Sequence, residues 1–457
     1  MKINLLSFLL IIAFVTKQSS SFAQWNALGG LNGLSANNYI YSVCGDPSGN
    51  IYAGGEFKNS SGNCYVAKWD GTSWSELGGL NGLSADAYIF SVCSDPSGNI
   101  YAAGSFTNSS GNNYIAKWDG TSWGELGGLN SLAANSVIFS VCSDPSGNIY
   151  AAGFFNNSSF NCYVAIWNGT SWSELGGLDG LAANWDINTI CSDASGNIYA
   201  GGGFTNSSGK RYVAKWDGTT WSELGGLNAL AASGDIRSIC TDASGNIYAA
   251  GGFFNSSGKY YVAKWDGTAW SELGGLNGLS AGSYIYAVCS DSSGNIYTGG
   301  LFKNSSGNSY VAKWNGTAWS ELGGLNGLAA NNRIITVNTD ALGNIYAGGF
   351  FMNGSGKRYV AKYGLATTDI NETAASNTVV AVYPNPTTQY STIKFNNVNK
   401  ESITLTLYDT QGQLVRSIYN IYSEEIRISK EDLSGGLYFF LLATDKKLIG
   451  NGKLIIE

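Results

Sequence analysis

The chain has 457 residues, a net charge of −7, 62 Gly, 14 Trp, 27 Tyr and no His. The lack of His excludes Ser-His-Asp and Cys-His catalysis, His-based zinc and copper sites, and haem ligation by His. Only 12% of the residues are charged and the balance is acidic, which argues against nucleic acid, because its binding needs clustered Lys and Arg.

The first 23 residues have the composition of a secretory signal peptide. Lys2 precedes an apolar run, residues 3–15, and a polar stretch then leads to the small-residue site Ser21-Phe22-Ala23. We predict that residues 1–23 are the signal peptide and that cleavage falls between Ala23 and Gln24. The apolar run is shorter than the ~20 residues that a membrane span needs, and no other stretch approaches that length. The sequence therefore predicts an exported protein without a transmembrane segment.

A pattern Trp-x-x-Leu-Gly-Gly then recurs at a constant step of 49 residues. Its copies begin at Trp25, Trp74, Trp123, Trp172, Trp221, Trp270 and Trp319. In the first full repeat, residues 39–46, 51–57, 65–70 and 74–79 read as strands, and turn sequences rich in Asp, Asn, Ser and Gly separate them. A fixed period of this length predicts a β-propeller with one blade per repeat. We name the strands of a blade a to d, with a innermost.

The phase of the repeat predicts how the ring closes. The repeat region, residues 24–365, starts with a d-type strand at residues 25–30 and stops after a c-type strand at residues 359–365. Only the N-terminal strand is left to complete the last blade. We therefore predict an all-β fold, a seven-bladed β-propeller of four-stranded blades whose N-terminal strand closes the ring.

The end of strand b, with Gly54 and Gly55, the aromatic residue on strand c and the Trp that opens strand d resemble the kelch repeat. Trp69 stands about where kelch repeats have Tyr, and the Arg usual on strand a is missing from most copies. The resemblance implies a propeller but no activity, because this fold carries many chemistries. A copper oxidase of the galactose-oxidase kind needs His ligands and is excluded.

Beyond the repeats, residues 366–380 are rich in Thr, Ala, Asn and Ser and predict a linker. Residues 381–457 alternate apolar and polar positions as a small C-terminal β-sandwich would. Their motifs resemble the type A C-terminal sorting domain of the Bacteroidota type IX secretion system. The matching residues are Tyr383, Pro384, Asn385 and Pro386, then Asp409 and Gly412 in Leu-Tyr-Asp-x-x-Gly-x-x-Val, Gly436 and Tyr438 in Leu-x-x-Gly-Leu-Tyr, and Lys453 in the basic, apolar end. The resemblance implies the type IX machinery as a partner and secretion to, or beyond, the outer surface of a Gram-negative cell.

Polar groups that recur in every blade are expected to be structural. These are the carboxylates in the positions of Asp46 and Glu76, and the Asn of the Asn-Ser-Ser loops, beginning with Asn59, which we expect in turns. Six Cys share one position of strand a, and equivalent positions of neighbouring blades should lie further apart than a disulfide spans. We expect these thiols, and Cys64 and Cys162, to be free. No metal or cofactor site is predicted.

The copies differ most where the loop from strand d enters strand a. Trp185 is the one Trp outside the two repeated Trp positions. Near it the entrance carries polar residues, whereas other copies carry aromatic ones. The candidate ligand-binding residues are Trp185, Asp186, Asn188, Asp235, Arg237 and Arg333, with Tyr39, Tyr41, Tyr88, Tyr284 and Tyr286. Aromatic faces beside carboxylates and Arg suit sugar or peptide recognition, and neutral drift at a solvated rim is the other interpretation.

Two functions remain open at this point. The first is a non-enzymatic binding or adhesion protein, exported or at the cell surface, that binds a glycan or peptide at the central end formed by the d-to-a and b-to-c loops. The alternative is a polysaccharide hydrolase in which Asp186 and Asp235 act as the carboxylate pair.

Overall fold

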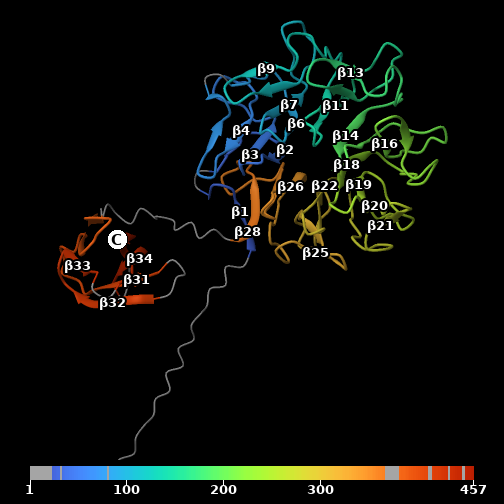
Figure 1. Ribbon diagram of the computed structural model, residues 1–457. Helices are drawn as coiled ribbons and strands as arrows, with labels where there is room; N and C mark the ends of the chain where they lie inside the picture. Colours follow the sequence, from blue (N-terminus) through green and yellow to red (C-terminus); the bar gives the residue numbers. More distant parts are fainter. Residues whose placement is uncertain are drawn as a thin grey trace, which may run out of the picture. The chain divides into compact units, whose positions relative to one another are not determined.

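The computed structural model describes residues 23–30, 33–79, 82–365, 380–409, 414–430, 433–444 and 448–457. Within these ranges every regular element is a β-strand (Figure 1). The chain divides into two compact units, Met1–Ala366 and Thr367–Glu457. The predicted signal peptide up to Phe22, and the predicted linker up to residue 379, lie outside the described residues.

The first unit is built from seven four-stranded antiparallel sheets. The a strands are β2 (Ile40–Gly45), β6 (Ile89–Ser94), β10 (Ile138–Ser143), β14 (Ile187–Ser192), β18 (Ile236–Thr241), β22 (Ile285–Ser290) and β26 (Ile334–Thr339). The b strands are β3 (Ile51–Gly55), β7 (Ile100–Gly104), β11 (Ile149–Gly153), β15 (Ile198–Gly202), β19 (Ile247–Gly251), β23 (Ile296–Gly300) and β27 (Ile345–Gly349).

The c strands are β4 (Ala67–Trp69), β8 (Ala116–Trp118), β12 (Ala165–Trp167), β16 (Ala214–Trp216), β20 (Ala263–Trp265), β24 (Ala312–Trp314) and β28 (Ala361–Leu365). The d strands are β5 (Trp74–Glu76), β9 (Trp123–Glu125), β13 (Trp172–Glu174), β17 (Trp221–Glu223), β21 (Trp270–Glu272), β25 (Trp319–Glu321) and, from the N-terminus, β1 (Ala23–Ala27). The d strands are shorter than the sequence pattern suggested, because the Gly pair that follows each of them has positive φ and turns the chain.

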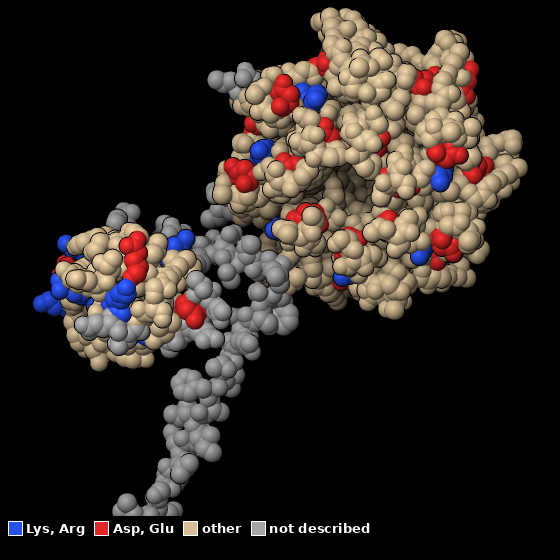
Figure 2. Space-filling view, in the orientation of Figure 1, with Lys and Arg blue, Asp and Glu red and all other residues tan. Residues whose placement is uncertain are grey.

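The sheets form a closed ring (Figure 1), and we call the hollow at its centre, visible in Figure 2, the channel. Each a strand contacts the a strand of the next sheet, and β26 contacts β2. Strand β1 pairs with β28, with Trp25 opposite Tyr363. The last sheet is therefore completed by the N-terminal strand, as its repeat phase predicts. Since this pairing joins the two ends of the repeat region, it fixes the ring by backbone hydrogen bonds.

The repeated Trp ties each sheet to its neighbour. The indole of Trp74 donates from Nε1 to the Leu28 carbonyl at 3.0 Å, and the same bond recurs between neighbouring d strands around the ring. At the closing sheet Trp25 donates to the Leu322 carbonyl at 2.9 Å. The first Gly of the motif is needed at this contact. A Cβ on Gly176 would lie 3.1 Å from Cδ1 of the Trp221 ring, and the φ of Gly176 is +91°.

The core of the ring lies between sheets rather than in one central mass. One cluster joins Tyr52 of β3 to Ile89, Ile100 and Phe106 of the next repeat, all nearly or completely buried, and equivalent clusters fill the other gaps. Each b strand packs against neighbouring residues on both of its faces, which explains why it is buried at every position.

The second unit contains two sheets, ordered β29-β30-β33 and β32-β31-β34-β35. The strands are β29 (Ala381–Tyr383), β30 (Tyr390–Lys394), β31 (Ile403–Tyr408), β32 (Leu414–Ile421), β33 (Glu425–Ser429), β34 (Gly436–Ala443) and β35 (Leu448–Ile456). Alternate residues from both sheets, among them Ile393, Ile428, Leu405 and Phe440, enclose one apolar core, as in a β-sandwich.

Candidate functional site

The variable residues gather at the end of the channel where strands a begin. Every a–b strand pair has a register shift at the same place, between Ile40 and Ser42 in the first sheet and at the equivalent residues of the other six. Bulges of this kind redirect a side chain. The residue between these two positions differs among the seven copies: it is Tyr41, Phe90, Phe139, Asn188, Arg237, Tyr286 or Ile335. We call this end of the channel the entrance.

One side of the entrance is lined by a continuous row of aromatic rings. Tyr39 stacks on Phe350 with ring centroids 3.5 Å apart and an interplanar angle of 2°. Tyr41 lies 6.0 Å from Phe350 and 5.2 Å from Phe90, which in turn lies 5.8 Å from Phe139. Tyr88 stands 6.1 Å from Phe90. These rings come from four neighbouring sheets, and we call the group Phe350, Tyr39, Tyr41, Tyr88, Phe90 and Phe139 the aromatic arc.

A carboxylate binds one hydroxyl group of this arc and affects a second. The Tyr41 hydroxyl donates to Glu56 Oε2 at 3.2 Å. Burial, and then the Glu56 carboxylate, raise the pKa of Tyr41. The pKa of Tyr88 is also raised, first through a hydrogen bond to Glu56. The Glu56 carboxylate thus fixes the direction of the Tyr41 hydroxyl at the entrance.

A charged cluster lies on neighbouring sheets of the same entrance. Asp235 is held between two arginines, with Oδ1 2.8 Å from Arg211 Nε and Oδ2 3.1 Å from Arg237 Nη2. Burial raises the pKa of the nearby Asp186, although its Oδ1 accepts the Gly203 N–H at 3.0 Å, and the charge of Asp235 raises it further. Asn188 Nδ2 is buried among the described residues without a hydrogen-bond partner.

Trp185 covers the edge of this cluster. Its side chain is 58% exposed, and its ring meets Phe154 edge-on with centroids 5.7 Å apart. The ring fits because residue 203 is Gly: a Cβ there would lie 2.4 Å from Trp185 Cδ1 and 2.4 Å from Asp186 Oδ1. An exposed indole fixed beside charged groups is a surface on which a ligand ring can stack.

Arg333 departs from the grouping that its sequence position suggested. Instead of joining the polar residues, its guanidinium carbon lies 3.8 Å from the ring centroid of Phe350 and 6.0 Å from that of Tyr286. Tyr286 in turn stacks against Tyr284, with centroids 6.3 Å apart. The structure therefore joins Tyr284, Tyr286 and Arg333 to the aromatic arc, and leaves Asp186, Asp235 and Arg237 in the separate charged cluster.

Two sets of site residues escaped the sequence analysis. The first follows strand b, at Glu56, Ser105, Phe154, Gly203, Gly252, Leu301 and Phe350. The second ends the b-to-c loop, at Cys64, Asn113, Cys162, Arg211, Tyr260, Ser309 and Arg358. Both sets vary among the copies while their neighbours stay constant, so the same comparison of copies would have found them. Their members complete the site: Arg211 pairs with Asp235, Tyr260 lies 5.2 Å from Tyr284, and Arg358 lies 4.7 Å over Tyr39.

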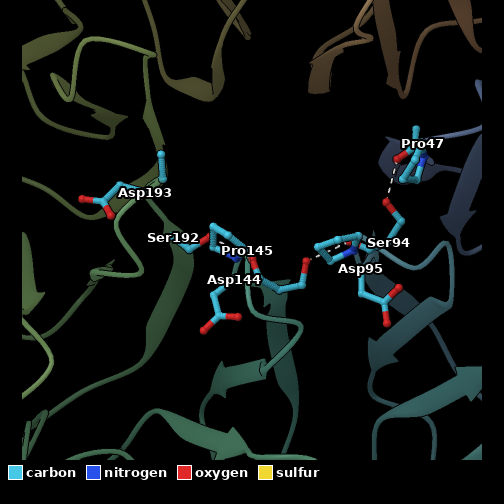
Figure 3. Close-up of a pocket in the computed structure, with 11 residues that line it drawn as sticks. Pro47, Ser94, Asp95, Asp144, Pro145, Ser192 and Asp193 are labelled. Atoms are coloured by element: carbon cyan, nitrogen blue, oxygen red, sulfur yellow. Dashed lines mark hydrogen bonds between the residues drawn. The ribbon is translucent and has the colours of Figure 1, made fainter.

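The opposite end of the channel holds a cavity of about 410 Å³. It is lined by the a-to-b turns of four neighbouring sheets, with Pro47, Pro96, Pro145, Ser94, Ser143 and Ser192 among the lining residues (Figure 3). The serine hydroxyls donate to backbone carbonyls of the preceding sheet, for example Ser94 to Gly45 at 2.8 Å, and the Asp144 carboxylate points away from the Pro145 ring (Figure 3). Figure 2 shows a central hollow in this unit, with charged side chains scattered around it.

The groups that recur in every blade serve the framework. Asp46 accepts the N–H groups of Ser48 and Asn50, the Asn50 amide and the Tyr52 hydroxyl at 2.7 to 2.9 Å, and its six copies do the same. Asn59 accepts N–H groups within its own loop and donates to Glu76. These contacts confirm that the repeated carboxylates and Asn residues are structural.

All eight cysteines are free, as expected. Burial raises the pKa of the six strand-a thiols. In the seventh copy the position is Asn338, whose Nδ2 donates to the Val43 carbonyl at 2.9 Å across the closing contact. In the other copies a Ser or Thr hydroxyl at the position of Gly45 donates to the preceding sheet. Gly45 has no hydroxyl, so the Asn338 bond joins the two sheets at the closing contact.

The sorting-motif residues hold the last strand of the second unit. Asn385 accepts the Ile455 N–H at 2.8 Å and donates to the Lys453 carbonyl at 2.9 Å. Tyr438 is buried and donates to the Ser434 carbonyl at 2.7 Å, and Gly436 begins β34 opposite Ile456. Asp409 lies just after β31, whereas Gly412 lies outside the described residues. The motif therefore builds the fold of this unit.

Comparison with known families decides what this unit is. The family model of the secretion system C-terminal sorting domain matches residues 381–457. This unit is a type IX secretion sorting domain. The sorting domain directs the protein to the cell surface or beyond it, and implies contact with the type IX machinery. No helix of the described residues is long and apolar enough to cross a membrane.

Solved structures match the chain at low sequence identity. The extracellular domain of a hybrid two-component system protein from B. thetaiotaomicron matches with a TM-score of 0.52 and 13% identity, covering 95% of this chain and 59% of that domain. A second such extracellular domain from the same organism matches with a TM-score of 0.49 and 13% identity, over 95% of this chain and 57% of that one. The WD40 propeller domain of Doa1 matches with a TM-score of 0.47 and 14% identity, over 76% and 97%. The chain thus spans less than two thirds of the two bacterial domains. No curated protein matches the sequence.

Proposed function

We propose that the exported protein is a seven-bladed, kelch-like β-propeller that binds a glycan or peptide at its entrance, without catalysis, as a binding or adhesion protein of the cell surface. The observation that supports this most is where the copies differ. The packing residues, the Trp contacts and the Asp turns are kept around the ring, whereas the differences collect at one end of the channel. There they place stacking rings next to arginines and carboxylates, the combination that recognises a ligand by area and by directed hydrogen bonds.

The alternative hydrolase rests on Asp186 and Asp235. Both oxygens of Asp235 already bind arginines, and Asp186 accepts a backbone N–H. The two ion pairs commit Asp235 to holding the arginines, so the site lacks the second free carboxylate that glycoside hydrolysis needs. The binding function is therefore favoured.

A glycan and peptide array probed with the chain from Gln24 to Glu457 tests the proposal. We expect binding without turnover, and its loss in Trp185→Ala and Asp186→Ala. Leu342→Ala is the control, because Leu342 is 86% exposed in an a-to-b turn at the opposite end. Turnover of a polysaccharide that Asp186→Ala abolishes would support the hydrolase instead. Absence of both binding and turnover would contradict the proposal.

A further inference from the structure

The arginines of the first unit are confined to the entrance. Residues 24–365 contain four, Arg211, Arg237, Arg333 and Arg358, and each contacts the arc or the charged cluster. The lysines of the same unit recur on strand c and in the b-to-c loops. Asp235 pairs with two of the four arginines, whereas Arg333 and Arg358 pack over aromatic rings.

Arg333 is the cation least neutralised by its surroundings. Arg211 and Arg237 share Asp235, and Arg358 donates from Nη1 to the Asn37 carbonyl at 3.3 Å. Within the described ranges Arg333 forms no ion pair, and its guanidinium carbon lies 3.8 Å from the ring centroid of Phe350. A guanidinium over a ring face can still offer the N–H donors at its edge to both oxygens of a carboxylate.

The backbone at the channel offers little to a peptide. Peptides that dock on a sheet do so through the free N–H and C=O groups of an edge strand. Here the channel side of strand a is already bonded by the neighbouring sheet: Val92 N–H donates to Ser42 Oγ at 3.0 Å and Val141 N–H to Ser91 Oγ at 3.1 Å. Along these strands, recognition therefore rests on side chains.

Flat rings with donors at their edges suit a sugar. A pyranose presents a C–H face that packs on an aromatic ring, and its hydroxyls meet polar groups around that ring. Tyr286 lies beside Arg333 and stacks against the exposed Tyr284, whereas the ring of Tyr39 is covered by Phe350 and Arg358. The Tyr41 hydroxyl donates to Glu56, so this pair adds acceptor oxygens. We infer that the entrance binds an acidic glycan, with the carboxylate of a uronic-acid residue on Arg333 and neighbouring sugar rings on the tyrosines. This inference rests on the proposed binding function and specifies its ligand.

Titration calorimetry with matched glycans tests the inference. The probes are polygalacturonate and alginate, each beside its carboxyl-reduced, neutral form, with the chain from Gln24 to Glu457. We expect at least one acidic polymer to bind, and carboxyl reduction to weaken it roughly tenfold to a hundredfold, the usual effect of removing a charge-assisted bond. Arg333→Gln should lower the affinity for the acidic polymer by the same factor and should leave the affinity for the neutral polymer unchanged.

Two variants keep this test decisive. Arg333→Lys keeps the charge and loses the planar fork, so it should bind between wild type and Arg333→Gln, which also guards against a failure of Arg333→Gln to fold. Lys264→Gln is the control. Lys264 belongs to strand β20, outside the entrance, and its Nζ lies 6.0 Å from the ring centroid of Tyr248. This variant should bind with wild-type affinity.

The outcomes separate this inference from the proposal beneath it. Equal binding of acidic and neutral polymers, binding of peptides alone, or unchanged affinity in Arg333→Gln would overturn the uronic-acid assignment and leave the binding function standing. No binding to any glycan or peptide would overturn both.

Discussion

The closure of the ring by the N-terminal strand makes a quantitative prediction. Trp25→Ala removes the Nε1 bond to the Leu322 carbonyl, the contact with Tyr363 at 5.4 Å, and the packing against the last interface cluster. A fully buried Trp→Ala change costs about 3–5 kcal/mol, and Trp25 is half-buried, so its packing is worth roughly 2 kcal/mol. The unpaired Leu322 carbonyl adds about 1 kcal/mol. We expect a loss of roughly 3 kcal/mol in unfolding free energy.

The matched control is Trp172→Ala in an interior sheet. Trp172 is equally half-buried and donates to the Leu126 carbonyl at 3.0 Å, so the two variants should lose the same stability in urea unfolding followed by circular dichroism. A strand that frays at a chain end contributes almost nothing to global stability. If Trp25→Ala unfolds like wild type while Trp172→Ala is destabilised, the N-terminal strand does not close the ring and the reasoning is wrong.

Four other predictions follow from local contacts. Gly203→Ala should leave stability near wild type but alter ligand binding on the array, because a Cβ would displace Trp185 and Asp186. Thiol titration without reductant should find eight reactive thiols in the unfolded chain, and the six strand-a thiols unreactive in the native one at pH 8, since burial raises their pKa. Backbone and Thr hydrogen bonds lower the pKa of Asp70, Asp119, Asp217 and Asp266 to about 2. The stability that these four carboxylates contribute is therefore complete above about pH 4 and is lost as the pH falls towards 2. In the variant with all four Asp→Asn, the urea midpoint should change less with pH over that range. The variant should fold, because Asn168 and Asn315 already make the same bonds. A stop codon at position 381 should retain the protein inside the outer membrane, and normal release on fractionation would contradict the sorting role.

The repeat pattern determined the framework because its interactions are local or periodic. Asp46, Gly49 and Asn50 form a turn with groups no more than six residues apart, so the motif alone predicts it. The phase from Trp25 to residue 365 left a single strand to complete the last sheet, and β1 fills that place. The motifs of residues 381–457 likewise predicted the sorting domain, because their order along the chain is itself the signal.

Only the tertiary structure decided which variable residues meet. Arg211 binds Asp235 across a gap between sheets, Arg333 stacks on Phe350 rather than joining Asp186, and Arg358 lies over Tyr39 from the far end of the repeats. Arg333 and Phe350 flank one strand hairpin, Arg211 and Asp235 lie in consecutive repeats, and Arg358 meets Tyr39 only because the ring closes. The sequence by itself determined a ring of repeated strands and the protein's route out of the cell. The packing of strands and sheets decided the chemistry of the entrance, because residues 17 or more positions apart along the chain become neighbours only in the folded ring.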